Sequence, residues 1–323
     1  MRDLLTPRLT YIVEYPDAVK LTDEQVSIFW PPNEVHVEKD VQDILVNLTP
    51  AERHGVITTL KLFTQYELLV GNEYWNRVAQ LFSKPACVAR MANCFSFFEL
   101  NVHAPFYSKI NEALGLANEE FYTEYTRDPV LAERIEMLEA FANVDEDDPI
   151  SVAMFLAMLA MTEGVVLYSS FAFLKHFQSQ GKNKILNIVR GINFSARDEG
   201  LHSMASAWLY RTFLEEQKLD TAVFQRHVET MVNAVREHEY KIIEKIFEKG
   251  EIEGCTAHQY RCFVDSRIDL VLQNLGHEAM FKPAYNPIGD WFYKGMNDYI
   301  ANDFFTGTGR EYGRNWDEAA LGW

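Results

Sequence analysis

ISVAMFLAMLAMTEGVVLYSSFAFL, residues 150–174, is the stretch that decides the fold. It is nearly long and apolar enough to span a bilayer as a helix. It carries a single charge near its centre, Glu163, and no second segment of this kind offers a partner span. Such a helix is typical of the buried core of a soluble bundle. A lone ionised carboxylate there would be costly, so Glu163 must be paired, protonated or bound to a metal.

Long helical patterns surround this stretch on both sides. Strand-like alternation is nearly absent, and few glycines interrupt the helices. Thr49-Pro50 resembles an N-cap followed by proline in the first turn. Helices longer than the globular mean indicate an all-α bundle. The expected helices cover residues 49–82, 85–114, 150–177, 183–217, 221–249 and 256–275, with shorter pieces within 118–142.

The two ends of the chain differ from this pattern. Residues 1–48 look irregular and contain four prolines. From about Pro283 onward the chain is rich in Gly, Asn, Asp and aromatic residues, which predicts a flexible tail with little regular structure. We therefore expect one helical domain over residues 1–285, with an irregular N-terminal segment, and a C-terminal tail over residues 286–323.

Composition narrows the classes of function. The chain has 323 residues, 48% of them hydrophobic, so a sizeable core can be buried. Its formal net charge of −17 argues against binding to nucleic acid or to an anionic membrane, because both need clustered Lys and Arg. The four cysteines form no C-x-x-C motif, and the N-terminus lacks the apolar core of a signal peptide. We expect reduced thiols and a cytoplasmic protein.

Three more helical patterns place carboxylates inside apolar sequence. Glu67 lies in LKLFTQYELLVGNEYW, and CFSFFELNVHAPFY holds Glu99 and His103. RDEGLHS adds Glu199 and His202, three residues apart and therefore on one helix face. One Glu from each of two helices and a Glu/His pair from each of two others compose a carboxylate-bridged dimetal site. The predicted ligands are Glu67, Glu99, His103, Glu163, Glu199 and His202.

Most of these residues have a simpler explanation when taken singly. Glu67 fits the surface of an amphipathic helix, His103 fits a hydrogen-bonded core histidine, and Glu199 fits a solvated charge cluster. Only Glu163 lacks such an explanation, and the six together, on four helices, favour the dimetal site. Four carboxylates balance two divalent ions, and oxygen-rich ligation with one imidazole per metal suits iron or manganese better than structural zinc.

With these residues in place, the sequence resembles the radical-generating small (beta) subunit of class I ribonucleotide reductase. The resemblance runs from about Ser27 to the C-terminus and is strongest in SARDEGLHS, MTEGVVLYSSFAF and NVHAPFY. It implies a ferritin-like fold and a dimetal site of iron, manganese or both that activates an oxygen species. The resulting radical or oxidant would pass to a large (alpha) subunit, which reduces ribonucleoside diphosphates to deoxyribonucleotides. A homodimer is implied in the same way.

The resemblance also assigns roles outside the ligand set. Tyr107, four residues after His103, stands where the family has its radical tyrosine. Trp30, in FWPPNEVHVEKD, matches the tryptophan of the family's electron relay, and Asp198 would hydrogen-bond both His103 and Trp30. Tyr312, in GREYGRNW, is the candidate for the relay tyrosine of a tail that docks on the large subunit.

Two positions depart from the family pattern. The family writes its second pair as Glu-x-x-His, whereas Leu100 stands three residues before His103 and Glu99 stands four before it. A local π-bulge would still aim Glu99 and His103 at one site. The first ligand is Glu67, where the best-known members have Asp, and Glu there resembles the subclasses that use manganese. Either Tyr107 or the metal pair itself could then hold the oxidising equivalent.

Three other classes of function remain open at the level of sequence. A stand-alone ferritin-like oxidase or monooxygenase would share all six ligands but would need neither Trp30 nor Tyr312 nor a tail. An iron-storage protein of the ferritin type would be a shorter chain with shorter helices. A structural bundle without metal leaves Glu163 unexplained.

Overall fold

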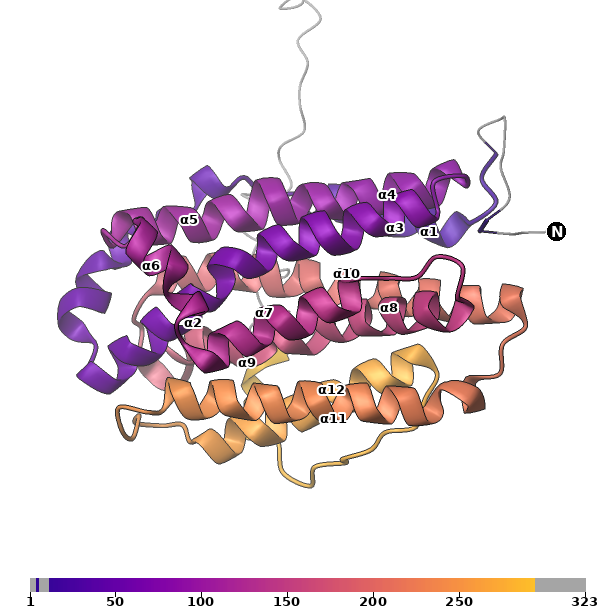
Figure 1. The fold of residues 1–323 in the computed structure, drawn as a ribbon. Coiled ribbons are helices and arrows are strands. Elements are labelled where there is room, and N and C mark those ends of the chain that lie inside the picture. Colours follow the sequence, from indigo (N-terminus) through magenta and orange to yellow (C-terminus); the bar gives the residue numbers. More distant parts are fainter. Residues whose placement is uncertain (1–3, 6–11, 294–323) are drawn as a thin grey trace, which may run out of the picture.

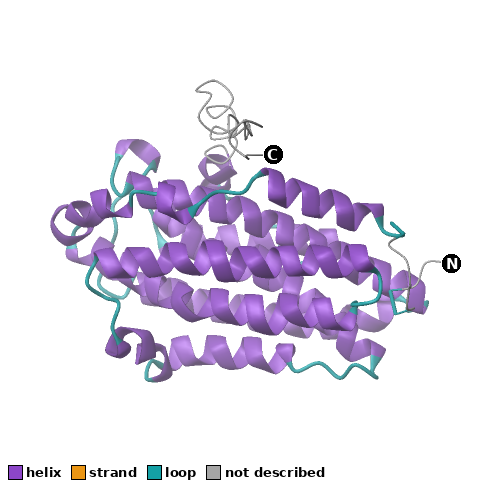
Figure 2. Cartoon of the chain, turned by 90° about the horizontal axis from the view of Figure 1, so that it is seen from above, coloured by secondary structure: helices purple, strands orange, loops and turns teal. Residues whose placement is uncertain are grey.

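The computed structural model describes residues 4–5 and 12–293. Within these ranges the regular structure is helical, apart from an isolated bridge between Ile252 and Cys255. The long helices run side by side along one axis (Figure 2). α1, α3, α4 and α5 form one side of the bundle, α11 and α12 the opposite side, and α8 and α10 lie between them (Figure 1). The predicted all-α, long-helix bundle is confirmed.

Three long rods are each interrupted by a π-helical segment. The first comprises α2 (Pro50–Leu69), η4 (Val70–Trp75) and α3 (Asn76–Leu81). The second comprises α4 (Ala86–Phe98), η5 (Glu99–His103) and α5 (Ala104–Ala113). The third comprises α8 (Pro149–Met161), η7 (Thr162–Val166) and α9 (Tyr168–His176). The other labelled α-helices are α1 (Pro16–Ser27), α6 (Glu119–Thr123), α7 (Pro129–Ala142), α10 (Leu186–Gln217), α11 (Thr221–Ile246) and α12 (Ala257–Leu275). Short 3-10 or π segments are η1 (Pro32–Glu34), η2 (Val37–Asp40), η3 (Asp43–Asn47), η6 (Glu124–Thr126) and η8 (Ser179–Gly181).

Local sequence explains where these helices begin. Thr49 forms a capping box with Glu52: the Thr49 hydroxyl accepts the Glu52 N–H at 3.2 Å, and the Glu52 carboxylate accepts the Thr49 N–H at 2.9 Å. Thr256 and Gln259 form the same box at the start of α12. Each box satisfies two backbone donors that a helix start leaves free, so the predicted N-cap at Thr49 is present.

The helix from Pro149 to His176 passes through the middle of the bundle. Among the described residues, this is the one helix that is long and apolar enough to cross a membrane. However, 83% of its most apolar 18-residue stretch is buried inside the protein. At Gly164 it passes close to two neighbours, since a Cβ there would overlap Ser203 Oγ of α10 and Val271 Cγ2 of α12. It is therefore the core helix of the bundle.

The N-terminal segment is more regular than its prolines suggest. Pro16 occupies the first turn of α1, and this helix buries Ala18, Thr22 and Gln25 at helical spacing. Two of these three residues are polar, so the stripe carries no hydrophobic period that sequence inspection would detect. The expectation of an irregular segment is therefore wrong for residues 16–27.

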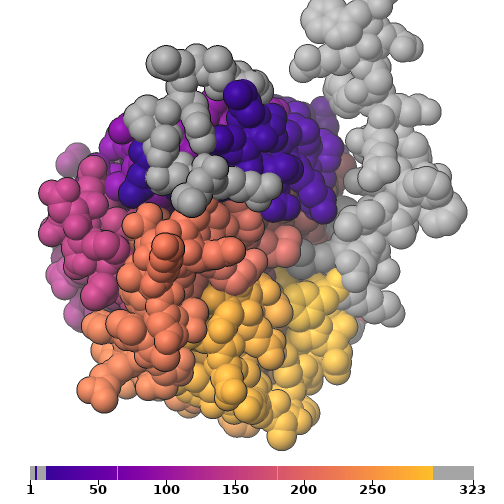
Figure 3. Space-filling view, turned by 90° about the vertical axis from the view of Figure 1, so that its right-hand side faces the viewer, coloured from indigo at the N-terminus to yellow at the C-terminus, as the bar shows by residue number. Residues whose placement is uncertain are grey.

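The start of the predicted C-terminal tail lies against the bundle. Residues 287–293 are helical, and Phe292 is fully buried. Lys175 Nζ donates a hydrogen bond to the Phe292 carbonyl at 2.9 Å. Figure 3 shows the C-terminal part of the described chain, in yellow, beside α11, in orange. The rest of the predicted tail, including Tyr312, lies outside the described residues.

Candidate metal centre

The fold brings all six predicted ligands into one cluster at the centre of the bundle. They form two groups whose ligand atoms lie within 4.8 Å of one another: Glu67, Glu99, His103 and Glu199, and Glu99, Glu163, Glu199 and His202. Each group contains one histidine and one glutamate of its own, and Glu99 and Glu199 belong to both. Every member is at most 1% exposed. This sharing suits two adjacent metal positions with Glu99 and Glu199 between them.

Each histidine directs Nδ1 at three carboxylates. His103 Nδ1 lies 3.1 Å from Glu99 Oε2, 3.1 Å from Glu199 Oε1 and 3.7 Å from Glu67 Oε2. The second histidine repeats the pattern on the other group. His202 Nδ1 lies 2.7 Å from Glu99 Oε1, 3.3 Å from Glu199 Oε2 and 3.8 Å from Glu163 Oε1.

The π-helical segments position three of the ligand-bearing helices. η5 begins at Glu99 and ends at His103, so one wide turn spans the four-residue spacing and both side chains face the cluster. Glu163 lies in η7, and η4 begins three residues after Glu67. The extra residue at ELNVH is therefore taken up by the helix geometry, and Glu99 reaches the same centre as the other ligands.

Burial and mutual charge strongly perturb these groups. Burial raises the pKa of the Glu67 and Glu163 carboxyls well above the ordinary value, and neighbouring carboxylates add to the effect. Burial also opposes ionisation of Glu99 and Glu199, but the two histidines outweigh it and keep both pKa values low. The surrounding carboxylates in turn raise the pKa of His103 and His202 despite burial. In the absence of metal, protons on the carboxyls and histidines therefore balance the negative charge of the cluster, and metal cations can take their place.

The donor set fits a pair of metal ions. Several buried ligand atoms make no hydrogen bond of acceptable geometry, although some of them lie close to a neighbouring ligand atom: both oxygens of Glu67 and Glu199, one oxygen of Glu99 and of Glu163, and both ring nitrogens of His202. Buried polar atoms are rarely left unpaired, so this concentration indicates atoms that are used for ligation. Three carboxylates and one imidazole per group suit iron or manganese.

A hydrogen-bonded chain leads from this cluster toward the N-terminal segment. Asp198 Oδ2 accepts the Trp30 indole N–H at 2.7 Å and lies 3.1 Å from His103 Nε2. A proton on Nε2 can be donated to Asp198 in this contact, while Nδ1 faces the carboxylates. The Trp30 and His103 rings are stacked with centroids 6.0 Å apart. The predicted contacts of Asp198 with both residues are present.

Tyr107 lies four residues after His103, in an apolar enclosure. It is 1% exposed, and its ring stacks on Phe63 with centroids 4.2 Å apart. Its hydroxyl donates a hydrogen bond to Ser195 Oγ at 3.2 Å. Burial, and next the charge of Glu67, raises the pKa of Tyr107 well above its ordinary value. The phenol is therefore protonated and protected from water.

Two aromatic residues at the cluster were missed from the sequence. The Trp75 indole donates a hydrogen bond to Glu163 Oε1, and the Tyr66 hydroxyl donates to the Thr162 carbonyl at 2.6 Å. Trp75 follows Glu67 by eight residues, which in a regular α-helix would place Trp75 about 80° round the helix from Glu67. The π-helical η4 between them takes up about one residue and restores the common face. The signal in the sequence that could have identified Trp75 is its position roughly two helical turns after the ligand Glu67.

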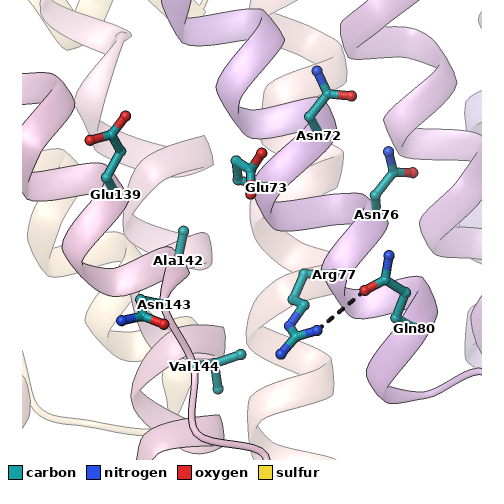
Figure 4. Close-up of a pocket in the computed structure, with 9 residues that line it drawn as sticks. All are labelled: Asn72, Glu73, Asn76, Arg77, Gln80, Glu139, Ala142, Asn143 and Val144. Carbon is teal, nitrogen blue, oxygen red and sulfur yellow. Dashed lines mark hydrogen bonds between the residues drawn. The ribbon is translucent and has the colours of Figure 1, made fainter.

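A polar groove of about 740 Å³ lies on the surface between η4–α3 and α7 (Figure 4). Side chains of Asn72, Asn76 and Glu139 line it, and Arg77 donates a hydrogen bond to Gln80 at its edge, at 3.3 Å. None of the six clustered residues lines this groove. It is a feature separate from the candidate metal centre.

Comparison with known families identifies a sequence relationship over most of the chain. The family model described as "Ribonucleotide reductase, small chain" matches residues 10–287. A probable ribonucleoside-diphosphate reductase small subunit of Invertebrate iridescent virus 3 is 25% identical, with 96% of this chain and 86% of the relative covered. The ribonucleoside-diphosphate reductase subunit beta of Treponema pallidum is also 25% identical, over 94% of this chain and 87% of its own.

Solved structures share the fold. A putative class I ribonucleotide reductase from Bacillus halodurans superimposes with a TM-score of 0.79 at 21% identity, covering 87% of this chain and 99% of the other. Dimanganese(II)-NrdF of Streptococcus sanguinis superimposes with a TM-score of 0.72 at 19% identity, covering 88% of this chain and 98% of the other.

Proposed function

The chain belongs to the ribonucleotide reductase small-chain family, and from this premise we propose a specific set of working residues within it. A small chain of ribonucleoside-diphosphate reductase carries a dimetal site of iron, manganese or both, and it acts together with a large subunit. We propose that the six clustered residues are the ligands of that site. The observation that carries this proposal is the pair of four-residue groups that share Glu99 and Glu199.

The ligands would divide by position. Glu67 and His103 would hold one metal, Glu163 and His202 the other, and Glu99 and Glu199 would bridge the two. When bound, the metal pair supplies the oxidising equivalent that starts reduction of the ribonucleotide in the large subunit. Asp198 keeps the Nε2 proton on His103, which leaves Nδ1 as the ligand atom. The aromatic wall formed by Phe63 and Phe171, with ring centroids 5.5 Å apart, excludes water from this region.

Two groups beside the cluster suit the storage and transfer of the oxidising equivalent. Tyr107 is the candidate radical residue, because it is enclosed and its hydroxyl proton has an acceptor in Ser195. We assign Trp30 and Asp198 to the relay toward the large subunit, since their hydrogen bond continues from His103. Tyr312 remains the proposed next member of the relay, in the tail that would dock on the large subunit.

We further propose that the chain forms a homodimer and works in the cytoplasm. Phe29 and Phe97, which are 50% and 47% exposed, both contact the ring of Phe98 and form an apolar patch on the α1–α4 side. Such a patch suits pairing with a second copy. All four cysteines are unpaired, which fits a reducing compartment.

The ligand assignment is tested by His202→Ala, with the exposed His258→Ala as the matched control. We expect the His202 variant to lose bound metal, and its activity with the large subunit to fall at least about 100-fold. The control should retain both. Metal analysis and reductase assays measure these outcomes, and normal metal content with normal activity in the His202 variant would show that the assignment is wrong.

A further inference from the structure

Arg267 of α12 is a buried cation that has no acidic partner among the described residues. Its side chain is 5% exposed, and within residues 12–293 no carboxylate forms an ion pair with it. Taking a guanidinium out of water without a counter-charge is costly. A bundle of this kind could place an apolar side chain at this position at lower cost. The role of Arg267 can therefore be inferred from the groups that it contacts.

Those contacts point in three directions. Nε donates a hydrogen bond to the Gly164 carbonyl at 2.9 Å, and Nη1 donates to the Tyr293 hydroxyl at 3.0 Å. The guanidinium carbon lies 3.8 Å from the centroid of the Tyr168 ring. The planar fork of an arginine can serve a carbonyl, a hydroxyl and an aromatic face together, whereas the ammonium of a lysine cannot keep this geometry.

The first contact is made beside a proposed metal ligand. Gly164 follows Glu163 in η7, and Thr162 on the other side of Glu163 is held by the Tyr66 hydroxyl at 2.6 Å. Side chains from α2 and α12 thus hold the carbonyls on both sides of Glu163. A π-helical turn has poorer hydrogen-bond geometry than an α-helix and needs such support. Arg267 helps to fix the turn that aims the Glu163 carboxylate.

The second contact is made at the base of the C-terminal segment. Tyr293 is the last described residue, at the end of the helical stretch 287–293. This stretch is fixed to the bundle by Phe292, whose ring centroid lies 5.0 Å from that of Phe263. A single guanidinium therefore connects Tyr293, at the end of the described chain, to the turn that carries Glu163.

We propose that Arg267 is a positioning residue that couples the C-terminal segment, through Tyr293, to the backbone turn that carries Glu163. Binding at that segment then changes how firmly Glu163 is held. The coupling rests on the proposed function in one respect: the partner that binds at the C-terminal segment is taken to be the large subunit. The positioning of Glu163 by Arg267 does not depend on any partner.

The first experiment tests the positioning without a partner. Arg267→Lys keeps the positive charge but loses the planar guanidinium group with its several N–H donors. Manganese-loaded protein is treated with a chelator, and metal release and the electron paramagnetic resonance spectrum are recorded. We expect release of one of the two metals to be roughly tenfold faster or more, with an altered spectrum. A wild-type release rate and spectrum in the lysine variant would overturn the proposal. If the wild type binds neither a manganese pair nor an iron pair, the proposed function fails instead.

The second experiment tests the coupling with a milder change. Tyr293→Phe removes one hydroxyl, and Tyr285→Phe, at a tyrosine that is 54% exposed in the same segment, is the control. In the wild type and the control, adding the large subunit should change the rate of metal release. In Tyr293→Phe the large subunit should bind with unchanged affinity but no longer alter that rate. An unchanged response in this variant would overturn the coupling.

Discussion

The indole of Trp75 reaches Glu163 from a helix that carries a different ligand. It donates a hydrogen bond to Glu163 Oε1, and its ring lies edge-on to His202 with centroids 5.8 Å apart. A donor at this position stabilises the ionised carboxylate and limits its rotation. At the scale of single residues, the geometry of the centre thus depends on a side chain that cannot itself bind a metal.

Trp75→Phe tests this dependence. The ring and its packing remain while the N–H is lost, so we expect metal affinity to fall about 10- to 100-fold, as when other partners of metal ligands are removed. Competition with a chelator measures the affinity. Tyr210→Phe is the control, because that buried hydroxyl pairs with His277 Nε2 at 2.9 Å, a residue outside the cluster. Equal affinities in the two variants would contradict the role of Trp75.

His176 makes the metal-free protein sensitive to acid. Burial, and then the charge of Lys182, lowers the pKa of His176 to about 4, whereas an unfolded chain protonates histidine near pH 6.5. Between these values the unfolded state binds the extra proton. Stability from this group is therefore complete above about pH 6.5 and is lost as the pH falls toward 4, by roughly 3 kcal/mol.

His176→Gln should remove that part of the pH dependence, since a glutamine amide can also donate to the Glu253 carbonyl, which His176 Nε2 approaches at 3.1 Å. Denaturant unfolding of both metal-free proteins at pH 7 and pH 4 gives the comparison. The wild type should lose more free energy of unfolding than the variant between the two pH values. Parallel losses would refute the assignment to His176.

At the scale of elements, the π-helical segments explain how Glu99 and His103 reach one centre at a spacing that differs from the expected Glu-x-x-His. The positions of the long helices follow from apolar periodicity and N-caps, as at Thr49, and are predictable. The six ligand positions are predictable because a buried carboxylate such as Glu163 needs a proton, an ion pair or a metal, which directs attention to the other carboxylates and histidines in apolar helices. A π-turn adds a residue without changing the composition, so only the odd spacing of Glu99 and His103 signals one.

Other parts of the centre depend on contacts between distant segments, which one sequence does not display. Arg267 and Gly164 are 103 residues apart, and their hydrogen bond exists only once α12 packs against η7. Trp75 and Glu163 are 88 residues apart. The helix α1 was missed for a different reason, because its buried face includes Thr22 and Gln25 and has no apolar stripe.

Gly164→Ala tests how closely η7 must approach its neighbours. The added methyl group would overlap Ser203 Oγ and Val271 Cγ2. We expect a loss of about 1–3 kcal/mol in the free energy of unfolding, as for other overpacked cores, together with reduced metal content. Gly200→Ala is the control, because its Cβ would lie 3.4 Å from the Tyr168 hydroxyl, near ordinary contact. Denaturant unfolding and metal analysis distinguish the two.

At the scale of the whole molecule, the C-terminal tail separates a reductase subunit from an enzyme that acts alone. Truncation of residues 304–323 removes Tyr312 and leaves the described bundle intact. We expect unchanged metal content and loss of reductase activity with the large subunit, because docking and the relay are both removed. Metal analysis and the coupled assay measure the two properties. Full reductase activity in the truncated chain would show that neither docking nor the relay needs residues 304–323.

The apolar core helix also affects how the chain can be made. Residues 149–176 resemble a membrane span in length and hydropathy, and they are covered by α10, α11 and α12, which are synthesised later. At ordinary translation rates, roughly 5 to 20 seconds pass between the emergence of this segment and the completion of its cover. During that interval a nascent chain on the ribosome exposes a long hydrophobic surface. We expect chaperone availability to limit the yield of soluble protein during overexpression.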